Sequence, residues 1–357
     1  MKGFHLERSR HDIKHFYEWL GYGWGDHISE WMKLYSERGD ESIRRVCIIA
    51  PRSHSKSTTL RVKLIHQCLF DKWKNKPVTV WLFSASIPAA KRRLEEIKED
   101  MRNHPDLRKM LNESRTKKDE LHFNNGSWIK ATGVGSAIRG EHPAVVALDD
   151  VLADLGDTSM DTITDWFRKV ITPMLDPESA LYVVGTPMSL TDLYHTEMLS
   201  EAAQEVWKSG VWSAIPNWDE HRADPSIQLK ALWPDFRPLA FLLEQKLSMN
   251  DELAFTQEYL CKVVDDDSQV FKRGVIRKNV NVGVCLGLKK EFDDQKYVIG
   301  FDPAHGIGKD YSVMIVLRQD AQGIIHFVNM WRRNDFPPDQ QANTIIEWCK
   351  LYGKPIL

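Results

Sequence analysis

Apolar and polar residues follow two rhythms along the chain, one typical of buried strands and the other of amphipathic helices. Short, continuous apolar runs predict strands at 45–50, 78–84, 121–123, 128–131, 144–148 and 181–184. Apolar residues at helical spacing predict helices in residues 1–40 and over 57–70, 89–111 and 162–171. Because strands and helices alternate, we expect an α/β fold with a mostly parallel sheet covered by helices, in which ligands bind at the carboxyl ends of the strands.

The pattern changes after residue 195. Segment 196–271 is rich in Trp and interrupted by prolines, and its best helical stretch is 240–260, which predicts a small lid or linker subdomain. Strands at 297–301, 312–317 and 324–331, followed by a helix after Pro337-Pro338, predict a further domain. We therefore expect domains over 1–195, 196–290 and 291–357. Within the first, Asn125-Gly126 favours a type I′ hairpin turn.

Composition narrows the class of protein only slightly. The 357 residues are 42% hydrophobic, enough for real cores, and Lys+Arg 48 against Asp+Glu 50 gives a net charge of -2, which neither supports nor excludes DNA binding. The cysteines are scattered without C-x-x-C pairing, so we expect buried thiols of a reducing compartment and no zinc site. No apolar signal segment or membrane-length apolar run is present, so we expect a soluble, intracellular protein without membrane contact.

The segment after the first predicted strand has the residue order of a phosphate-binding loop. An apolar strand leads through a polar loop to Lys56-Ser57, which open the next helix. A lysine at this point reaches the β- and γ-phosphates of a nucleotide, and the hydroxyl binds Mg²⁺. Measured against G-x-x-x-x-G-K-[ST], however, Ala50 and Ser55 replace both glycines, so a polar turn that caps a helix is the alternative for this segment alone.

Two later strand ends carry chemistry of the same kind. The strand at 144–148 is followed by Asp149-Asp150, which suits a metal-binding acid and a second acid that polarises the attacking water. The next strand ends in Gly185-Thr186-Pro187, a polar element placed to sense the γ-phosphate. Three strand-end motifs in the order expected of an ATPase sheet favour nucleotide hydrolysis over a chance arrangement.

At this point the chain resembles the large terminase subunits of tailed bacteriophages over nearly its whole length. The family's loop commonly reads P-R-G-H-G-K-S-T, and residues 51–58 keep all but the two glycines, where Ser53 and Ser55 stand. Residues 133–143 are similar to the family segment that ends in Arg-Gly before the acidic strand. Gly185, Thr186 and Pro187 look like the family's coupling motif.

The resemblance implies a role for each of these residues. The nucleotide is ATP, and the loop that binds it consists of Arg52, Ser53, His54, Ser55, Lys56, Ser57 and Thr58. Ser57 and Asp149 hold Mg²⁺, and Asp150 takes the place of the usual catalytic Glu. Arg139 would be the arginine finger offered to a neighbouring subunit; its alternative interpretation is a surface arginine in a glycine-rich loop.

The last domain resembles the start of the family's RNase H-like nuclease. A strand ends in Asp302-Pro303-Ala304, and Asp310-Tyr311 opens the next strand, which is similar to the family's G-x-D-P-A…G-x-D-[YF]. By that resemblance Asp302 is a ligand of Mg²⁺ or Mn²⁺ and Asp310 an auxiliary one. The partner carboxylates should come after Leu357, so we expect an incomplete nuclease site, in a fragment or a truncated gene product.

The resemblance also implies the partners and the place of action. They are double-stranded DNA, the portal protein, the small terminase subunit and further copies of the chain on the procapsid, in the cytoplasm of the bacterial host. The basic stretch 91–118 is a candidate for contact with DNA phosphates, although such helices are often simply solvated. Two alternatives stay open: another P-loop nucleic-acid ATPase of helicase type, and an inactive prophage remnant.

Overall fold

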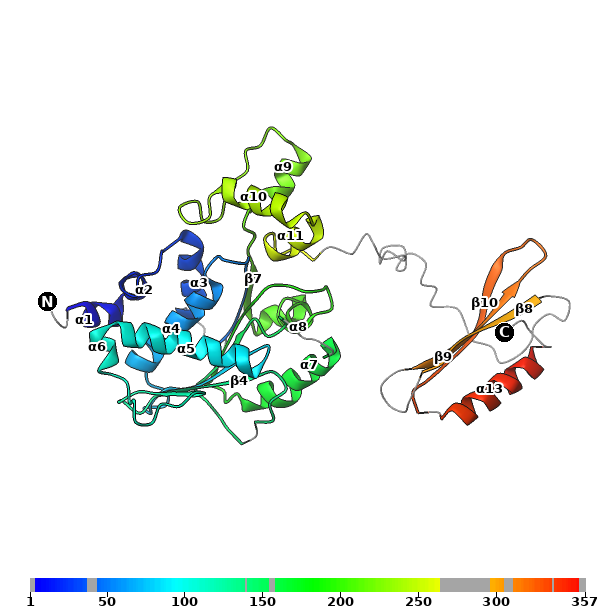
Figure 1. Cartoon of the computed structure of the whole chain (residues 1–357), viewed down its shortest axis with the longest axis horizontal. Coiled ribbons are helices and arrows are strands. Elements are labelled where there is room, and N and C mark those ends of the chain that lie inside the picture. Colours follow the sequence, from blue (N-terminus) through cyan, green and yellow to red (C-terminus); the bar gives the residue numbers. More distant parts are fainter. Residues whose placement is uncertain are drawn as a thin grey trace. The chain divides into compact units, whose positions relative to one another are not determined.

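The computed structural model of the chain describes residues 4–36, 44–138, 140–153, 158–263, 296–304, 311–335 and 337–352. The chain divides into two compact units, Met1–Val270 and Phe271–Leu357 (Figure 1). Arg139, Asp310 and Cys285 lie outside the described residues, as do residues 264–290 of the expected lid or linker subdomain.

A seven-stranded sheet in the order β3-β4-β2-β5-β6-β1-β7 forms the centre of the first unit. Every pairing in it is parallel except that of β3 with β4. The strands are β1 Arg45–Ile49, β2 Thr79–Ser84, β3 Glu120–His122, β4 Trp128–Gly133, β5 Val145–Asp149, β6 Ala180–Gly185 and β7 Lys208–Val211. The mixed α/β fold with a mostly parallel sheet, predicted from the alternation of elements, is confirmed.

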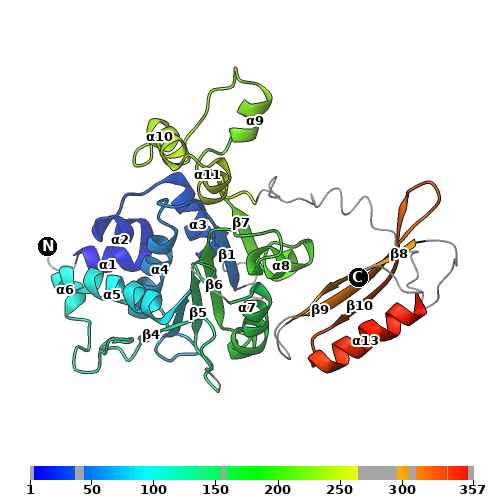
Figure 2. The ribbon, with the colours of Figure 1, turned by 45° about the vertical axis from the view of Figure 1, so that its right-hand side comes forward.

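Helices cover both faces of this sheet. Alternate residues of β1 point to opposite faces, with Val46 and Ile48 in one apolar core and Cys47 and Ile49 in the other. The first core includes residues of α2 Ile13–Trp19, α3 Asp26–Ser36, α4 Lys56–Phe70 and α5 Ile87–Asn103. The second includes residues of α7 Met160–Trp166, the π-helix η1 Phe167–Ile171 and α8 Leu193–Glu197. Figure 2 shows the two sets of helices on either side of the strands.

Short elements complete the first unit. They are α1 Phe4–His11, α6 Pro105–Arg108, the 3-10 helices η2 Thr172–Met174 and η3 Glu201–Glu205, and α9 Trp218–Ala223, α10 Leu239–Met249 and α11 Glu252–Glu258. Helices α9 to α11 share a small core of their own around Trp218, Leu242 and Phe255. The segment predicted as a lid or linker is thus divided, because β7 joins the sheet beside β1 while α9 to α11 form the small core.

Three local expectations differ from the structure. The helix expected over 89–111 ends at Asn103, because Pro105 forces the preceding residue, His104, out of the helical conformation (ψ 112°). The helix expected over 240–260 is broken at Asn250, which adopts a left-handed conformation (φ 48°) between α10 and α11. The turn between β3 and β4 is not type I′, because only Gly126, and not Asn125, has a positive φ.

The described part of the second unit is a three-stranded antiparallel sheet, in the order β10-β9-β8, with one helix. Its elements are β8 Lys296–Asp302, β9 Ser312–Gln319, β10 Ile325–Arg333 and α13 Pro338–Leu351. Tyr297 and Ile299 of β8 and Met314 of β9 pack against Trp348 and Tyr352. The three strands and the following helix occur where the sequence predicts them.

Candidate nucleotide-binding site

The loop between β1 and α4 has the backbone shape of an anion-binding loop. Ser53 (φ 62°) and Ser55 (φ 67°) both adopt the left-handed conformation, at the positions where the resembling family has glycines. Ser55 is the N-cap of α4 and makes no side-chain cap bond. The N–H groups of the first turn of α4 have no intrahelical partners, so this end of the helix suits a phosphate group.

Four side chains from two elements meet next to this loop. Ser57 Oγ donates a hydrogen bond to Asp149 Oδ1 over 2.7 Å, and Lys56 Nζ lies 3.4 Å from Asp150 Oδ2. Lys56 is only 7% exposed, so its ammonium group is held inside the site rather than in solvent. Asp150 also has a left-handed backbone (φ 48°), which turns the chain sharply after β5. The structure thus brings together the residues at the ends of β1 and β5 that the sequence singles out.

The strand between β1 and β5 contributes the third motif. In β6, Gly185 pairs with Ile49 of β1, and Val184 pairs with Asp149 of β5. A Cβ atom on Gly185 would lie 2.3 Å from Tyr194 Oη, which explains the glycine. Thr186 and Pro187 continue from this strand end, so all three motifs lie at one edge of the sheet.

Asp192 fixes the segment that follows Pro187. Its buried carboxylate accepts hydrogen bonds from the backbone N–H groups of Met188 and Ser189, and from both the N–H and Nδ1 of His195. Burial acts to raise the pKa of Asp192, but these hydrogen bonds outweigh it and the pKa is lowered. An ionised, fully hydrogen-bonded carboxylate therefore braces the loop after β6.

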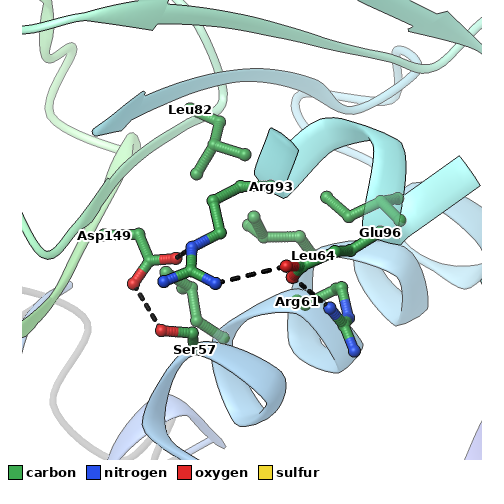
Figure 3. Close-up of a pocket in the computed structure, with 9 residues that line it drawn as sticks. Ser57, Arg61, Leu64, Leu82, Arg93, Glu96 and Asp149 are labelled. Atoms are coloured by element: carbon green, nitrogen blue, oxygen red, sulfur yellow. Dashed lines mark hydrogen bonds and ion pairs between the residues drawn. The ribbon is translucent and has the colours of Figure 1, made fainter. Parts of the chain in front are cut away.

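Asp149 is the most perturbed acid of the site. It is 3% exposed, and burial raises its pKa to about 6, with a further contribution from the negative charge of Asp150. Arg93, Ser57 and Lys56 oppose this rise. Figure 3 shows Arg93 of α5 directed at Asp149, with Nε 2.9 Å from Oδ2. In the sequence Arg93 is only one member of a basic helix, and nothing there indicates which arginine of that helix faces inward.

The small subdomain, which consists of α9 to α11 and the residues that flank them, contacts the same loop. The backbone N–H of Arg52 donates to the carbonyl of Glu258 over 2.9 Å, and Arg52 Nε lies 3.8 Å from the Glu258 carboxylate. Arg237 Nε donates to the carbonyl of Ser53 over 3.1 Å. Sequence reasoning missed Arg237 and Glu258, which precede α10 and end α11, because only the fold brings them to the loop.

His54 is a buried member of the loop. Its Nδ1 donates to the carbonyl of Arg52 over 2.8 Å. Burial lowers its pKa to about 4, so the ring is neutral at physiological pH. His27 of α3 lies beside it, with ring centroids 6.3 Å apart. His54 therefore stiffens the loop and brings no charge to the phosphates. Thr58, the last residue of the expected loop, is half-buried in the first turn of α4.

The oxygen atoms of Ser57 and Asp149 suit Mg²⁺, which prefers hard oxygen ligands. In the ranges that the structure describes, no three His, Cys, Asp or Glu side chains gather into a metal cluster. Magnesium commonly takes one or two protein oxygens and completes its shell with phosphate oxygens and water. The two residues therefore fit a metal that arrives with a nucleotide.

Asp302, the candidate nuclease ligand, is exposed at the last position of β8. Its expected companion Asp310 and the expected arginine finger Arg139 lie outside the described residues, so their predicted roles stay predictions.

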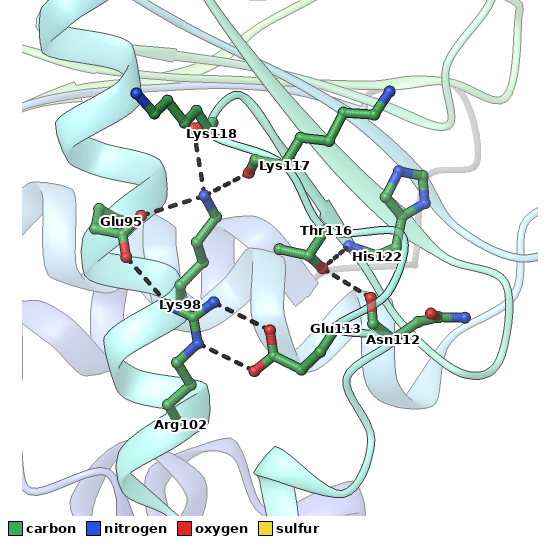
Figure 4. A network of polar contacts seen from close by, with 9 residues as sticks. All are labelled: Glu95, Lys98, Arg102, Asn112, Glu113, Thr116, Lys117, Lys118 and His122. Carbon is green, nitrogen blue, oxygen red and sulfur yellow. Dashed lines mark hydrogen bonds and ion pairs between the residues drawn. The ribbon is translucent and has the colours of Figure 1, made fainter.

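Much of the basic stretch 91–118 has structural partners. Figure 4 shows buried Lys98 directed at the carbonyls of Lys117 and Lys118, and Arg102 bound to Glu95 and Glu113. Arg92, Arg108, Arg115 and Lys118 are exposed side chains of the same stretch. The local basic excess is therefore smaller on the surface than in the sequence.

Among the described helices, none is both long and apolar enough to cross a lipid bilayer.

Solved structures that this chain is similar to include large terminases of bacteriophages. The large terminase of bacteriophage HK97 aligns with 92% of this chain and 68% of its own, at a TM-score of 0.54 and 14% identity. The large terminase of a thermophilic bacteriophage aligns with 92% of this chain and 74% of its own (TM-score 0.47, 9% identity). The ATPase domain of the Thermus phage P74-26 large terminase aligns with 71% of this chain and 98% of its own (TM-score 0.47, 16% identity). No protein-family model and no curated protein sequence matches the chain.

The first unit is a mixed α/β fold with a mostly parallel sheet, and the candidate site lies at the carboxyl ends of its strands. More particularly, the likeness to the HK97 protein shows that the chain has the fold of a phage large terminase, as the sequence resemblance implies.

Proposed function

We propose that this chain is the ATP-hydrolysing motor of a large terminase, which moves double-stranded viral DNA into a procapsid. The observation that carries the proposal is the meeting of Lys56, Ser57, Asp149 and Asp150 beside a loop with two left-handed residues, at one edge of a mostly parallel sheet. These residues have the chemistry that phosphoryl transfer needs, and the terminase fold supplies the biological setting.

Each residue has a part in hydrolysis that follows from its position. Backbone N–H groups of the loop and the first turn of α4 hold the phosphates, and Lys56 leaves Asp150 to contact the β- and γ-phosphates. Ser57 and Asp149 hold Mg²⁺, which neutralises charge on the phosphate oxygens when it is bound. Asp150, released from Lys56, polarises the attacking water. Gly185, Thr186 and Pro187 lie next to the γ-phosphate position and couple hydrolysis to movement.

The same proposal covers the second unit and the partners. The three antiparallel strands followed by a helix suit the start of an RNase H-like domain, with Asp302 as a ligand of Mg²⁺ or Mn²⁺ at the end of β8. Such a domain would cut concatemeric DNA. The motor would act in the host cytoplasm as a homo-oligomer on the procapsid, together with the portal protein and the small terminase subunit.

Substitution of the loop lysine tests the proposal. Lys56→Ala should abolish ATP turnover by the purified chain, because Lys56 is the lysine that opens α4 and is held inside the site beside Asp150. Lys72→Ala removes the same charge from an exposed position just after α4 and should leave turnover unchanged. Equal turnover in wild type and Lys56→Ala would reject the site. A wild-type chain that binds no ATP would favour a prophage remnant.

A mixing experiment extends this test to assembly. An arginine finger supplied by a neighbouring subunit is worth roughly 10³–10⁵ in rate, so Arg139→Ala and Lys56→Ala should each be inactive alone. Mixed together they should regain part of the activity, because a Lys56→Ala subunit can offer Arg139 to the intact loop of its neighbour. A mixture that stays inactive while wild-type subunits assemble and hydrolyse ATP would rule out this role of Arg139. ATPase activity stimulated by single-stranded but not by double-stranded DNA would favour the helicase-type alternative.

A further inference from the structure

Asp149, the proposed magnesium ligand, already has a cationic partner within the chain. Its two carboxylate oxygens are differently engaged: Oδ1 accepts from Ser57 over 2.7 Å, and Oδ2 lies 2.9 Å from Nε of Arg93. The carboxylate is 4% exposed and the arginine side chain 32%, so solvent screens this pair less than a surface pair. A metal ion that binds Asp149 therefore meets an arginine at the same group.

Arg93 has a second carboxylate within reach. Its Nη1 lies 3.3 Å from Oε1 of Glu96, one turn further along α5. Glu96 in turn binds Arg61 Nη1 through Oε2 at 2.5 Å, and Arg61 Nε lies 2.8 Å from Asp100. Figure 3 shows Arg93 between Asp149 on one side and Glu96 on the other. The guanidinium group can therefore leave Asp149 and keep a carboxylate partner, because Glu96 stays within reach.

Two cations cannot share one buried carboxylate without repulsion. The interaction between charges a few ångströms apart is strong where water is largely excluded, and a divalent ion doubles it. Ser57 and Asp149 form one side of the proposed metal site, and Arg93 contacts the carboxylate oxygen that Ser57 does not use. Metal binding and the Arg93–Asp149 contact therefore oppose each other.

We propose that Arg93 is an internal counter-cation that competes with the divalent metal for Asp149 and turns to Glu96 when the metal–nucleotide complex binds. This inference rests on the proposed nucleotide site. Arg93 then lowers the affinity of the site for the metal, and metal binding breaks the Arg93–Asp149 contact that joins α5 to the end of β5. The arrival of the nucleotide is in this way transmitted to α5 and, through Glu96 and Arg61, to α4.

The inference predicts opposite effects on metal affinity for substitutions of two residues of α5, Arg93 and Glu96. Arg93→Gln removes the competing charge and should tighten metal binding about tenfold, the size expected when a cation close to a divalent ion is removed. Glu96→Gln removes the alternative partner of Arg93, leaves the arginine on Asp149 and should weaken metal binding. If the contacts served only to support the fold, both substitutions would weaken binding.

The experiment uses the full chain and Mn²⁺ as the probe. Free and bound Mn²⁺ are measured by electron paramagnetic resonance during titration in the presence of ADP, so no turnover is needed. Arg92→Gln is the matched control, since it removes an exposed charge from the adjacent position of α5 and should leave the affinity unchanged. Arg93→Lys keeps the charge and should remain within about threefold of wild type.

The outcomes separate the inference from the function on which it rests. If wild type shows no ADP-dependent Mn²⁺ binding, the proposed function fails first. If wild type binds and folded Arg93→Gln binds Mn²⁺ equally or more weakly, Arg93 is not a competitor. Should Arg93→Gln fail to fold, as judged by circular dichroism, Arg93→Met takes its place, because it keeps much of the apolar stem without the charge. Equal or weaker Mn²⁺ binding by that variant overturns the proposal.

Discussion

Two serines of the phosphate loop have backbone conformations that glycine adopts without strain. Ser53 has φ 62° and Ser55 has φ 67°, and a side chain at such an angle costs on the order of 1 kcal/mol. The loop keeps this shape because its neighbours fix it: the carbonyl of Ser53 accepts from Arg237, and Arg52 is tied to Glu258. Contacts from the small subdomain thus compensate for the missing glycines.

Ser55→Gly should therefore stabilise the protein. We expect the free energy of unfolding to rise by up to about 1 kcal/mol, because glycine removes the left-handed strain. Ser55→Ala, which keeps a Cβ atom at the same φ, should give no such gain. Urea unfolding followed by Trp fluorescence measures both variants, and an equal gain from alanine would show that the serine hydroxyl, not the backbone, is the source of strain.

At the scale of elements, α5 is anchored to the loop that precedes β3 by a buried lysine. Lys98 is 2% exposed, and its Nζ donates to the carbonyl of Lys117 over 2.7 Å and contacts Glu95 at 3.2 Å. Arg102 adds a two-pronged contact with Glu113, at 3.1 Å on each side (Figure 4). In the sequence Lys98 is part of a stretch that suits a solvated or DNA-binding face, but in the structure it links α5 to the loop before β3.

Lys98→Ala should accordingly destabilise the first unit by about 2–3 kcal/mol, since hydrogen bonds from a charged donor to buried groups are lost together with the packing of its stem. Lys109→Ala, which removes an exposed lysine paired with Asp106, should cost less than about 1 kcal/mol. Thermal and urea unfolding of both variants gives the comparison. Similar losses for the two lysines would mean that Lys98 is not an anchor.

At the scale of the whole molecule, buried histidines link folding to pH. His27 is 1% exposed, between Trp31 and Trp233, and burial lowers its pKa from 6.5 to about 4; burial lowers that of His54 to about 4 as well. The unfolded chain therefore binds protons at these residues more readily than the folded chain does below pH 6.5. Stability from these residues is fully present above that pH and is lost as the pH falls toward 4.

Replacement of His27 isolates this effect. In wild type, His27 should contribute about 2 kcal/mol to the loss of stability between pH 7 and pH 5. His27→Phe replaces the imidazole with an apolar ring of similar size. The decrease in its free energy of unfolding between pH 7 and pH 5 should be about 2 kcal/mol smaller than in wild type, as measured by urea unfolding at the two pH values. An identical decrease in both proteins would mean that His27 is protonated in the folded state or reached by solvent.

The sequence by itself determined the order of elements and the location of the nucleotide motifs. Apolar runs and helical spacing are local properties, and they predict six of the seven strands of the sheet to within two residues. They miss β7, which lies in the segment predicted as a lid or linker, but they place Asp149 and Gly185 at strand ends and Lys56 just beyond one. Parallel strands bring their carboxyl ends to one edge, so residues far apart in the chain could be expected to meet. The break at Pro105 can also be read from the sequence, because a proline disfavours the helical conformation of the residue before it.

Only the tertiary structure decided which charged residues face one another. Periodicity separates a buried helix face from an exposed one, but it does not say that Arg93 meets Asp149, that Lys98 meets backbone carbonyls, or that Arg237 reaches the phosphate loop. Each of these contacts joins different elements, and its geometry depends on how the helices lie on the sheet. A polar side chain is moreover tolerated inside when a partner is present, and that partner is supplied by the fold rather than by neighbouring sequence.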